Sequence, residues 1–217
     1  FEQSATGFSL RAGVPLSEYA SLVGSYTLNY DDVSIDENRF FSDFDGDGID
    51  SCEPLLAGRF LCDAIGERTS SILGLTLSVD STDSRLRPTR GRNLAITTQY
   101  AGLGGSVNYL RVNGKVGQYY PLPAGFIFSL TAEGGAIRSF EDRGIPGTDD
   151  VRLTDRFFLG EPQIRGFDIR GVGPRVIRRP IRDTDGDGVG EVITDQDQIQ
   201  DDAIGGTAYY LGRAEIE

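Results

Sequence analysis

The feature that most constrains the fold is an alternation of apolar and polar side chains with a period of two residues. In the segment 71–80 the odd positions include Leu73, Leu75, Leu77 and Val79, whereas the even positions include Gly, Thr, Ser and Asp. Successive side chains of a β-strand point to opposite faces, so this pattern predicts a strand with one apolar and one hydrophilic face. The alternation returns in the segments 8–14, 21–29, 92–100, 110–116, 126–136 and 207–217. The sequence therefore predicts an all-β chain of about seven strands.

Two all-β architectures share this alternation: a soluble antiparallel sandwich and a membrane-spanning barrel. The segments run to roughly 9–13 residues, the length at which a tilted strand crosses a bilayer, whereas typical soluble strands have about 5–6. Charged side chains also lie in or near the middle of the polar faces, which suits a water-filled lumen: Arg11, Arg111, Lys115, Glu133, Arg213 and Glu215. Strand length and charge both favour the barrel.

The connections between strands alternate between short and long. Three are tight, at 15–18, 85–91 and 121–125, and two are very long, at 34–70 and 139–203. Outer-membrane barrels have short periplasmic turns and long extracellular loops. We therefore expect an antiparallel meander with two long extracellular loops. The lipid-facing side chains should share the convex face of the sheet, among them Leu73, Leu75, Leu77, Phe126, Phe128 and Leu130.

Composition argues against several classes of function. The 217 residues contain no His, the commonest general base and metal ligand, and no Ser or Cys lies in a recognisable nucleophile setting. The net charge of −12 argues against a nucleic-acid partner, because phosphate binding needs clustered Lys and Arg. The uncharged run 93–110 is interrupted by Thr, Gln, Asn and Gly and does not read as a transmembrane helix. We expect neither an enzyme nor a nucleic-acid-binding protein.

One short motif points to a family. Ile164, Arg165, Gly166 and Phe167 follow one another in a long glycine-rich loop between two strand-like segments. This tetrad resembles the sixth-loop signature of the Omp85 superfamily, whose members are outer-membrane β-barrels that insert or translocate other proteins. The resemblance implies a 16-stranded barrel in the outer membrane of a Gram-negative bacterium. It also implies that the loop tip folds back into the lumen, that no cofactor is required, and that the partners are unfolded outer-membrane proteins and outer-membrane lipid.

The resemblance covers nearly the whole chain. It assigns the sixth to twelfth strands of the barrel to residues 6–16, 19–33, 71–82, 91–101, 106–120, 125–138 and 204–217. The runs 87–91 and 205–208 are most similar to the branch that assembles outer-membrane proteins. On this alignment the chain is a single barrel domain truncated at both ends. The first five and last four strands would be missing, together with the periplasmic repeats through which assembly-complex lipoproteins bind.

Two other functions fit the same residues. A translocation barrel from another branch, such as a two-partner secretion transporter, carries a similar loop tetrad. A secreted, calcium-stabilised β-sandwich that acts as an adhesion module belongs to a different class and would dissolve without detergent.

Within the lumen, the resemblance implies an acidic partner for Arg165. The alternation puts Glu215 on the lumen face of the following strand, and Glu133 is the second choice. A guanidinium in a barrel interior should take a bidentate carboxylate, because an unpaired charge there is costly. The alternative is an exposed loop arginine that needs no fixed geometry.

Two segments repeat a pattern of alternate Asp with Gly between, at 43–50 and 183–188. Carboxylates spaced by two can converge on one Ca²⁺ ion when Gly permits a sharp turn. The candidate ligands are Asp43, Asp45, Asp47 and Asp50 in the first loop and Asp183, Asp185, Asp187 and Glu191 in the second. Neither loop is an EF-hand, because position twelve holds Pro54 or Thr194. The first is similar to the aspartate-rich repeats of thrombospondin type 3, and the alternative for both is a solvated turn.

Cys52 and Cys62 are the only cysteines, and both lie in the first long loop. An even number of cysteines in an oxidising compartment predicts a disulfide. Closing so short a loop removes about 2–3 kcal/mol of unfolded-state entropy, so we expect a structural role.

Overall fold

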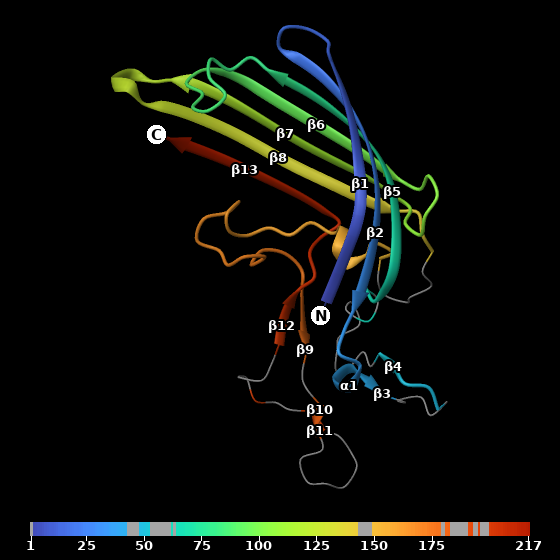
Figure 1. Cartoon of the computed structure of the whole chain (residues 1–217). Coiled ribbons are helices and arrows are strands. Elements are labelled where there is room, and N and C mark those ends of the chain that lie inside the picture. The colour runs from blue at the N-terminus through green and yellow to red at the C-terminus, as the bar shows by residue number, and fades with distance from the viewer. Residues whose placement is uncertain are drawn as a thin grey trace. The chain divides into compact units, whose positions relative to one another are not determined.

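The main element of the protein is one seven-stranded sheet. The computed structural model describes residues 2–42, 48–52, 62, 64–142, 149–178, 181–182, 191–192, 195 and 200–217. The strands follow the order β1-β2-β5-β6-β7-β8-β13, so each pairs with the next long strand along the chain (Figure 1). Their bounds are Glu2–Pro15 (β1), Ala20–Ser34 (β2), Gly66–Asp80 (β5), Gly91–Ala101 (β6), Tyr109–Pro121 (β7), Ile127–Ser139 (β8) and Ala208–Ile216 (β13). The predicted meander of seven long strands is confirmed.

The bounds differ from prediction where hydrogen bonds run to distant residues. Strand β6 spans the predicted 91–101, but β5 begins at Gly66 rather than at 71. Strand β7 begins at Tyr109 rather than at 106. The Ser106 N–H donates to the carbonyl of Thr69 in β5 (2.9 Å) and not to β6 or β8, the two strands beside β7. These partners lie 37 residues apart, so local pattern could not reveal them.

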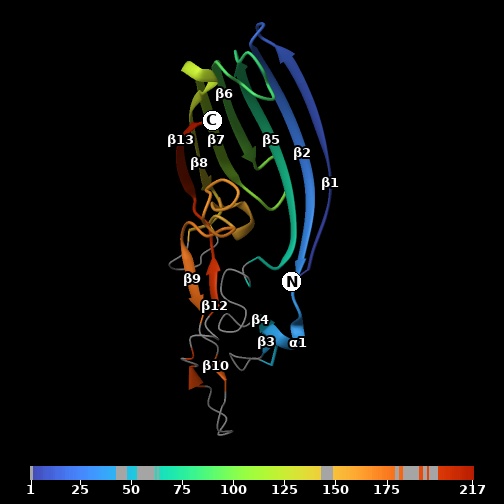
Figure 2. The same ribbon diagram turned by 90° about the vertical axis from the view of Figure 1, so that its left-hand side faces the viewer.

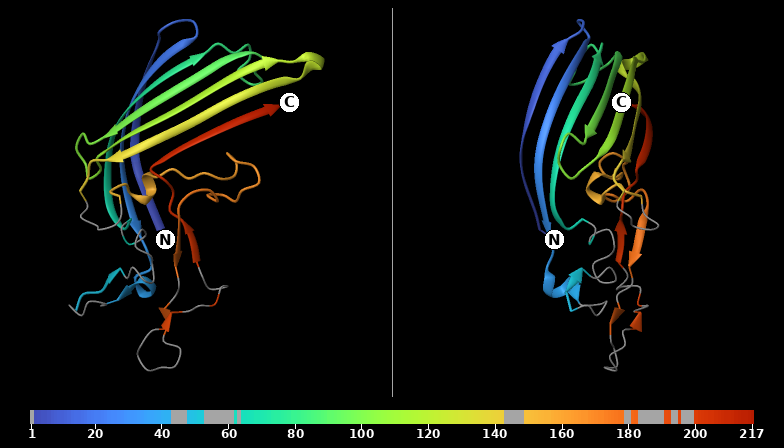
Figure 3. Two further views of the ribbon diagram at one scale, coloured as in Figure 1. Left: turned by 180° about the vertical axis from the view of Figure 1, so that it is seen from behind. Right: turned by 90° about the vertical axis from the view of Figure 1, so that its right-hand side faces the viewer.

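The sheet is a single layer. Figures 2 and 3 show the seven strands as one curved surface with β1 and β13 at its edges. A sandwich would pack two sheets face to face, so the adhesion-module alternative is wrong. Buried apolar side chains of the sheet gather near the long-connection end of β6 to β8, at Ala101, Val107, Tyr109 and Ile137. The described part of the chain contains no helix long and apolar enough to cross a membrane.

The two very long connections lie at one end of the strands, together with the short connection 102–108, and the three predicted tight turns lie at the other. Residues 16–19, 81–90 and 122–126 form the short turns, the last around a 3₁₀ turn, η1 (Pro123–Gly125). Residues 35–65, 102–108 and 140–207 form the connections at the other end. We call these the turn end and the loop end.

The contacts within the chain group into two compact units. The sheet unit comprises Ala5–Asp31, Arg68–Val151 and Thr207–Glu217, and the loop unit comprises Phe1–Ser4, Asp32–Glu67 and Arg152–Gly206. In its described residues, the loop unit holds short elements beside the ends of β1, β2 and β5. These are α1 (Glu37–Phe40), β3 (Phe41–Ser42), β4 (Ser51–Cys52), η2 (Leu153–Asp155), β9 (Arg175–Arg178), β10 (Ile181–Arg182), β11 (Glu191–Val192) and β12 (Gln200–Ala203). The pairs β3–β4, β9–β12 and β10–β11 are antiparallel.

Candidate membrane-spanning wall and loop motif

One face of the sheet is apolar and exposed. The register places Leu77 opposite Ile96, Leu94 opposite Val116 and Tyr120 opposite Phe128, so their side chains share this face. Its exposed large apolar side chains include Leu10, Leu73, Leu75, Ile96, Leu110, Val112, Val116 and Leu130. Leu75, in the middle of β5, is 51% exposed. A soluble surface rarely carries so extensive an apolar patch, whereas the outer wall of a membrane barrel requires one.

Polar side chains bound this apolar face at both ends. Arg92 lies opposite Gln118 at the turn end, and Arg138 lies opposite Leu110 at the loop end. Along β6 the band runs from Arg92 to Tyr100, a distance of about 26 Å at about 3.3 Å per residue. The strands of outer-membrane barrels tilt by about 35–45°, so this length rises about 20 Å along the membrane normal. The run 92–100 also falls within the roughly 9–11 residues with which a tilted strand crosses a membrane.

Aromatic rings lie towards both ends of the apolar band. At the turn end the rings of Tyr120 and Phe128 stack with centroids 6.3 Å apart. Towards the loop end the rings of Phe8 and Tyr26 lie 6.1 Å apart, and the Tyr26 hydroxyl makes a 3.0 Å hydrogen bond with the Ser71 hydroxyl. Barrels place such aromatic girdles at the two membrane–water interfaces, where an apolar ring and a polar hydroxyl are both satisfied.

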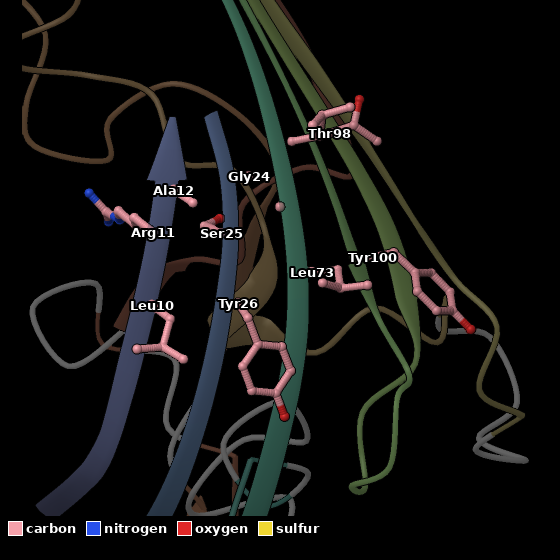
Figure 4. Close-up of a pocket in the computed structure, with 11 residues that line it drawn as sticks. Leu10, Arg11, Ala12, Gly24, Ser25, Tyr26, Leu73, Thr98 and Tyr100 are labelled. Carbon is pink, nitrogen blue, oxygen red and sulfur yellow. The ribbon is translucent and has the colours of Figure 1, made fainter. Parts of the chain in front are cut away.

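A shallow hollow of about 640 Å³ interrupts the apolar face over β1, β2, β5 and β6 (Figure 4). Ala12 and Gly24 have small side chains or none, whereas Leu10, Tyr26 and Tyr100 are large and line the same hollow. Its lining is mainly hydrocarbon, as expected for a surface that packs against acyl chains.

The opposite face is polar. On β7 it carries Arg111, Asn113 and Lys115, and Lys115 lies directly opposite Glu133 of β8. On β13, Arg213 lies opposite Thr131 and Glu215 opposite Ser129. Both acids proposed from the sequence as partners of Arg165 therefore lie on the polar face.

A buried ion pair at the loop end of this face was not predicted. The Asp31 carboxylate, 4% exposed, accepts hydrogen bonds from Asn29 Nδ2 (2.8 Å) and Arg68 Nη2 (3.5 Å). Asn29 and Asp31 alternate along β2 and so share a face, which the sequence shows. Arg68 lies before the predicted start of its strand, so its partnership with Asp31 could not be inferred.

The loop motif lies in a tightly turned part of the loop unit. Isolated bridges pair Phe157 with Gly206 and Leu159 with Val172, and the Ile164 N–H donates to the Gly160 carbonyl (2.9 Å). A Cβ at Gly160 would collide with the Asp168 carbonyl oxygen, so only glycine fits there. Gly166 has φ +85°, a conformation that L side chains rarely adopt. The Arg165 side chain is exposed at this turn.

Two arginines make side-chain contacts at the base of the same loop. The Arg170 guanidinium lies 4.7 Å above the centre of the Phe158 ring. Arg175 Nε pairs with Asp201 Oδ1 (2.7 Å), and its Nη2 donates to the Asp201 carbonyl (2.9 Å), which joins β9 to β12. The tip is therefore presented by an ordered loop, although the sequence offered no signal for these contacts.

The cysteine prediction is confirmed, because Cys52 and Cys62 form a disulfide. The calcium prediction is untested. Six of its residues, Asp43, Asp45, Asp47, Asp183, Asp185 and Asp187, lie outside the described residues, as does the side chain of Glu191. Asp50 is exposed, and the described residues contain no group of three or more metal-ligating side chains. Calcium binding by these loops stays a prediction, for which calorimetric titration of the complete protein is the direct test.

Comparison with known proteins gives consistent matches. A family model, described as the Omp85 superfamily domain, matches residues 1–216. The outer membrane protein assembly factor BamA of Neorickettsia risticii is 26% identical over 212 residues, which are 93% of this chain and 23% of that protein. The human sorting and assembly machinery component 50 homolog is 28% identical over 149 residues, 68% of this chain and 26% of that protein.

A solved structure shows the same fold. The crystal structure of BamA from Haemophilus ducreyi lacking POTRA domains 1–3 matches with a TM-score of 0.65 at 15% identity, over 99% of this chain and 37% of that chain. The chain spans about a quarter of the length of the curated relatives that it matches.

Proposed function

Because the chain belongs to the Omp85 superfamily, we propose that it forms part of the wall of a barrel that inserts other proteins into an outer membrane. The match of the family model to residues 1–216 carries this proposal. The two-faced sheet supports it, since one face has the composition of a lipid-facing wall and the other that of a wet lumen. Members of this family are assembly factors rather than enzymes, and they occur in the outer membranes of bacteria and mitochondria.

Within the family we infer a BamA-like factor of a Gram-negative outer membrane. The two BamA sequences align with 93% and 81% of this chain, whereas the human sorting and assembly relative aligns with 68%. A TamA-like or two-partner secretion barrel is the alternative. Unfolded outer-membrane proteins are then the substrates, and lipoproteins of an assembly complex would bind through periplasmic repeats. Outer-membrane lipid would contact the apolar face.

The tetrad Ile164 to Phe167 has a mechanical role in this proposal. The loop tip would fold into the lumen, where Arg165 would pair with Glu215 or, as second choice, with Glu133. Both acids lie on the polar face, and the planar guanidinium matches the two oxygens of a carboxylate. The pair would hold the loop against the wall while a client passes.

Reconstitution tests the proposed function. The complete protein is placed in liposomes, and an unfolded outer-membrane protein is added from the side of the turn end. We expect the client to become folded and resistant to external protease only in vesicles that contain the protein. A folded passenger released on the other side would indicate a secretion transporter. If the outer-membrane protein does not fold and no passenger is released, both the insertion function and the secretion alternative are wrong.

A further inference from the structure

The apolar face carries a positive charge at its loop-end boundary. The two-residue period of β8 places Arg138, and beyond the strand Phe140, on the same face as Leu130. The Arg138 guanidinium lies 6.0 Å from the centre of the Phe140 ring. Phe140 is itself held in place, because its N–H donates to the Asn108 carbonyl (2.9 Å). A cation is therefore positioned where the apolar band ends.

A tyrosine hydroxyl lies at the same boundary. The register joins Arg138 of β8, Leu110 of β7 and Tyr100 of β6 in one row on this face. A Cβ at Gly102 would lie 2.8 Å from the Tyr100 hydroxyl oxygen, so the ring reaches beyond the end of β6. Figure 4 shows this hydroxyl directed away from Thr98, towards the loop end. The row thus carries a guanidinium and a hydroxyl on either side of one leucine, two strand spacings or about 10 Å apart at the backbone.

Neither polar group has a partner within the described part of the chain. No hydrogen bond or ion pair there involves the Arg138 guanidinium or the Tyr100 hydroxyl. The acid nearest to Arg138 in the sequence, Glu141, accepts the Asn108 N–H instead (2.9 Å). A guanidinium at the edge of a membrane is stabilised when it reaches an anion or the polar headgroup region. This row therefore offers donors to an anion that lies at the membrane boundary.

The apolar face is hollow on the membrane side of this row. Gly134 lies four residues before Arg138 on β8 and opposite Gly114 of β7. A Cβ at Gly114 would meet no atom within 4 Å. The two glycines line a hollow of about 280 Å³, to which Ile96 and Val116 also contribute. Four residues of a strand span about 13 Å, so the hollow lies within reach of an acyl chain whose headgroup is at Arg138.

We propose that this row and this hollow together bind one phosphate-bearing lipid of the leaflet at the loop end. The phosphate would accept N–H donors from Arg138 and the hydroxyl of Tyr100, and an acyl chain would lie over Gly114 and Gly134. The inference rests on the proposed function only because that function places the apolar face in a membrane. A lipid fits better than free phosphate, because the donors adjoin an apolar hollow on the lipid-facing side.

The headgroup test compares two lipids with the complete protein in detergent. The probes are phosphatidylglycerol and a diacylglycerol with the same acyl chains, and native mass spectrometry measures the affinity of each. We expect phosphatidylglycerol to bind about tenfold more tightly, as one charged hydrogen bond or more would provide. Arg138→Gln should remove most of that difference. Tyr100→Phe should weaken binding of phosphatidylglycerol about threefold and leave the diacylglycerol unaffected.

The acyl-chain contact has its own test. Gly114→Leu fills the hollow while leaving Arg138 and Tyr100 in place. We expect this variant to weaken binding of both lipids by the same factor, because it removes space for the chain and no donor for the phosphate. Unchanged binding of both lipids to Gly114→Leu would overturn the acyl-chain contact.

Matched variants separate this site from general attraction to basic side chains. Arg92 lies on the apolar face at the turn end, and Arg213 lies on the polar face. Arg92→Gln and Arg213→Gln should each change the affinity for phosphatidylglycerol less than twofold. Equal binding of the two lipids, or an equal loss with Arg92→Gln and Arg138→Gln, would overturn the inference. Inorganic phosphate that binds as tightly as phosphatidylglycerol would also overturn it.

The client-insertion assay distinguishes failure here from failure of the proposed function, because lipid binding is measured separately in detergent. If clients insert normally but the two lipids bind alike, only the lipid site is wrong. If clients do not insert at all, the proposed function itself is wrong.

Discussion

Among single residues, Asp83 has the strongest influence on local structure in the turn 81–90. Hydrogen bonds from the Thr89 hydroxyl, and then from the Thr89 and Arg90 N–H groups, lower its pKa from the ordinary 3.8 to about 2. A depressed pKa means that the carboxylate stabilises the turn at pH values above about 3.8, and that this contribution is lost as the pH falls towards 2.

We therefore expect the amides of the turn to keep their protection from hydrogen exchange at mildly acidic pH and to lose it as the pH falls towards 2. Asp83→Ala should abolish the protection at neutral pH as well. Exchange measured by mass spectrometry on peptides that span 81–91 is the appropriate readout. Unchanged protection in Asp83→Ala would show that the carboxylate does not hold the turn.

The charge of Arg165 offers a second residue-level test. Arg165→Glu should impair client insertion, because two carboxylates would face each other in the proposed lumen pair and repel. Adding Glu215→Arg should restore part of the activity by re-forming the pair with reversed charges. Insertion of a reporter barrel protein by the complete protein measures both effects. Normal insertion by Arg165→Glu would contradict the anchoring role, and rescue by Glu133→Arg instead would identify the other partner.

At the scale of elements, each strand has a lipid side and a lumen side, and adjacent residues lie on opposite sides. Ile96→Arg places a charge in the apolar band and should destabilise the folded protein by about 2–4 kcal/mol. Thr97→Arg, one residue further along β6, faces the polar side and loses only its 3.0 Å hydrogen bond with Thr76, worth about 1 kcal/mol. Urea unfolding in lipid vesicles compares the two. Equal costs would mean that β6 does not separate lipid from water.

The disulfide should stabilise its own loop and not the sheet. Closing a loop of this length contributes about 2–3 kcal/mol by restricting the unfolded chain. We expect reduction, or Cys52→Ser with Cys62→Ser, to expose the segment 32–67 to protease while β5 to β8 remain protected. Limited proteolysis with and without a reducing agent measures this. Cleavage within the strands after reduction would contradict the assignment of a local role.

Strand pattern could be predicted from sequence because side-chain alternation is a local property. The two-residue period of a strand predicts the apolar positions Leu73 and Leu75 and the polar positions Lys115 and Glu133. The contact of Ser106 with Thr69 joins residues far apart in the chain, so the ends of β5 and β7 were misplaced. The ion pair of Asp31 with Arg68 was missed for the same reason.

The polar face at the turn end shows the same limit more strongly. The row of Asn93, Gly117, Thr131 and Arg213 exists only once the register of four strands is known. Such neighbours depend on pairing between strands, which alternation alone leaves open.

At the scale of the whole molecule, the sheet unit has the features of a membrane-spanning wall with lipid on one face and water on the other. These features are the exposed apolar side chains, an apolar band as long as a membrane-crossing strand, aromatic rings towards both ends of the band, and the family match.

Cysteine accessibility along three neighbouring strands tests whether lipid and water lie on opposite faces of the sheet. Single cysteines replace Leu75, Ile96 and Val112 on the apolar face, and Thr76, Thr97 and Asn113 on the polar face, in the complete protein in native membranes. The native cysteines are paired and so do not react. We expect a water-soluble maleimide to label the polar-face positions and only a lipid-soluble reagent to label the apolar-face positions. Equal labelling of both sets by the water-soluble reagent would contradict it.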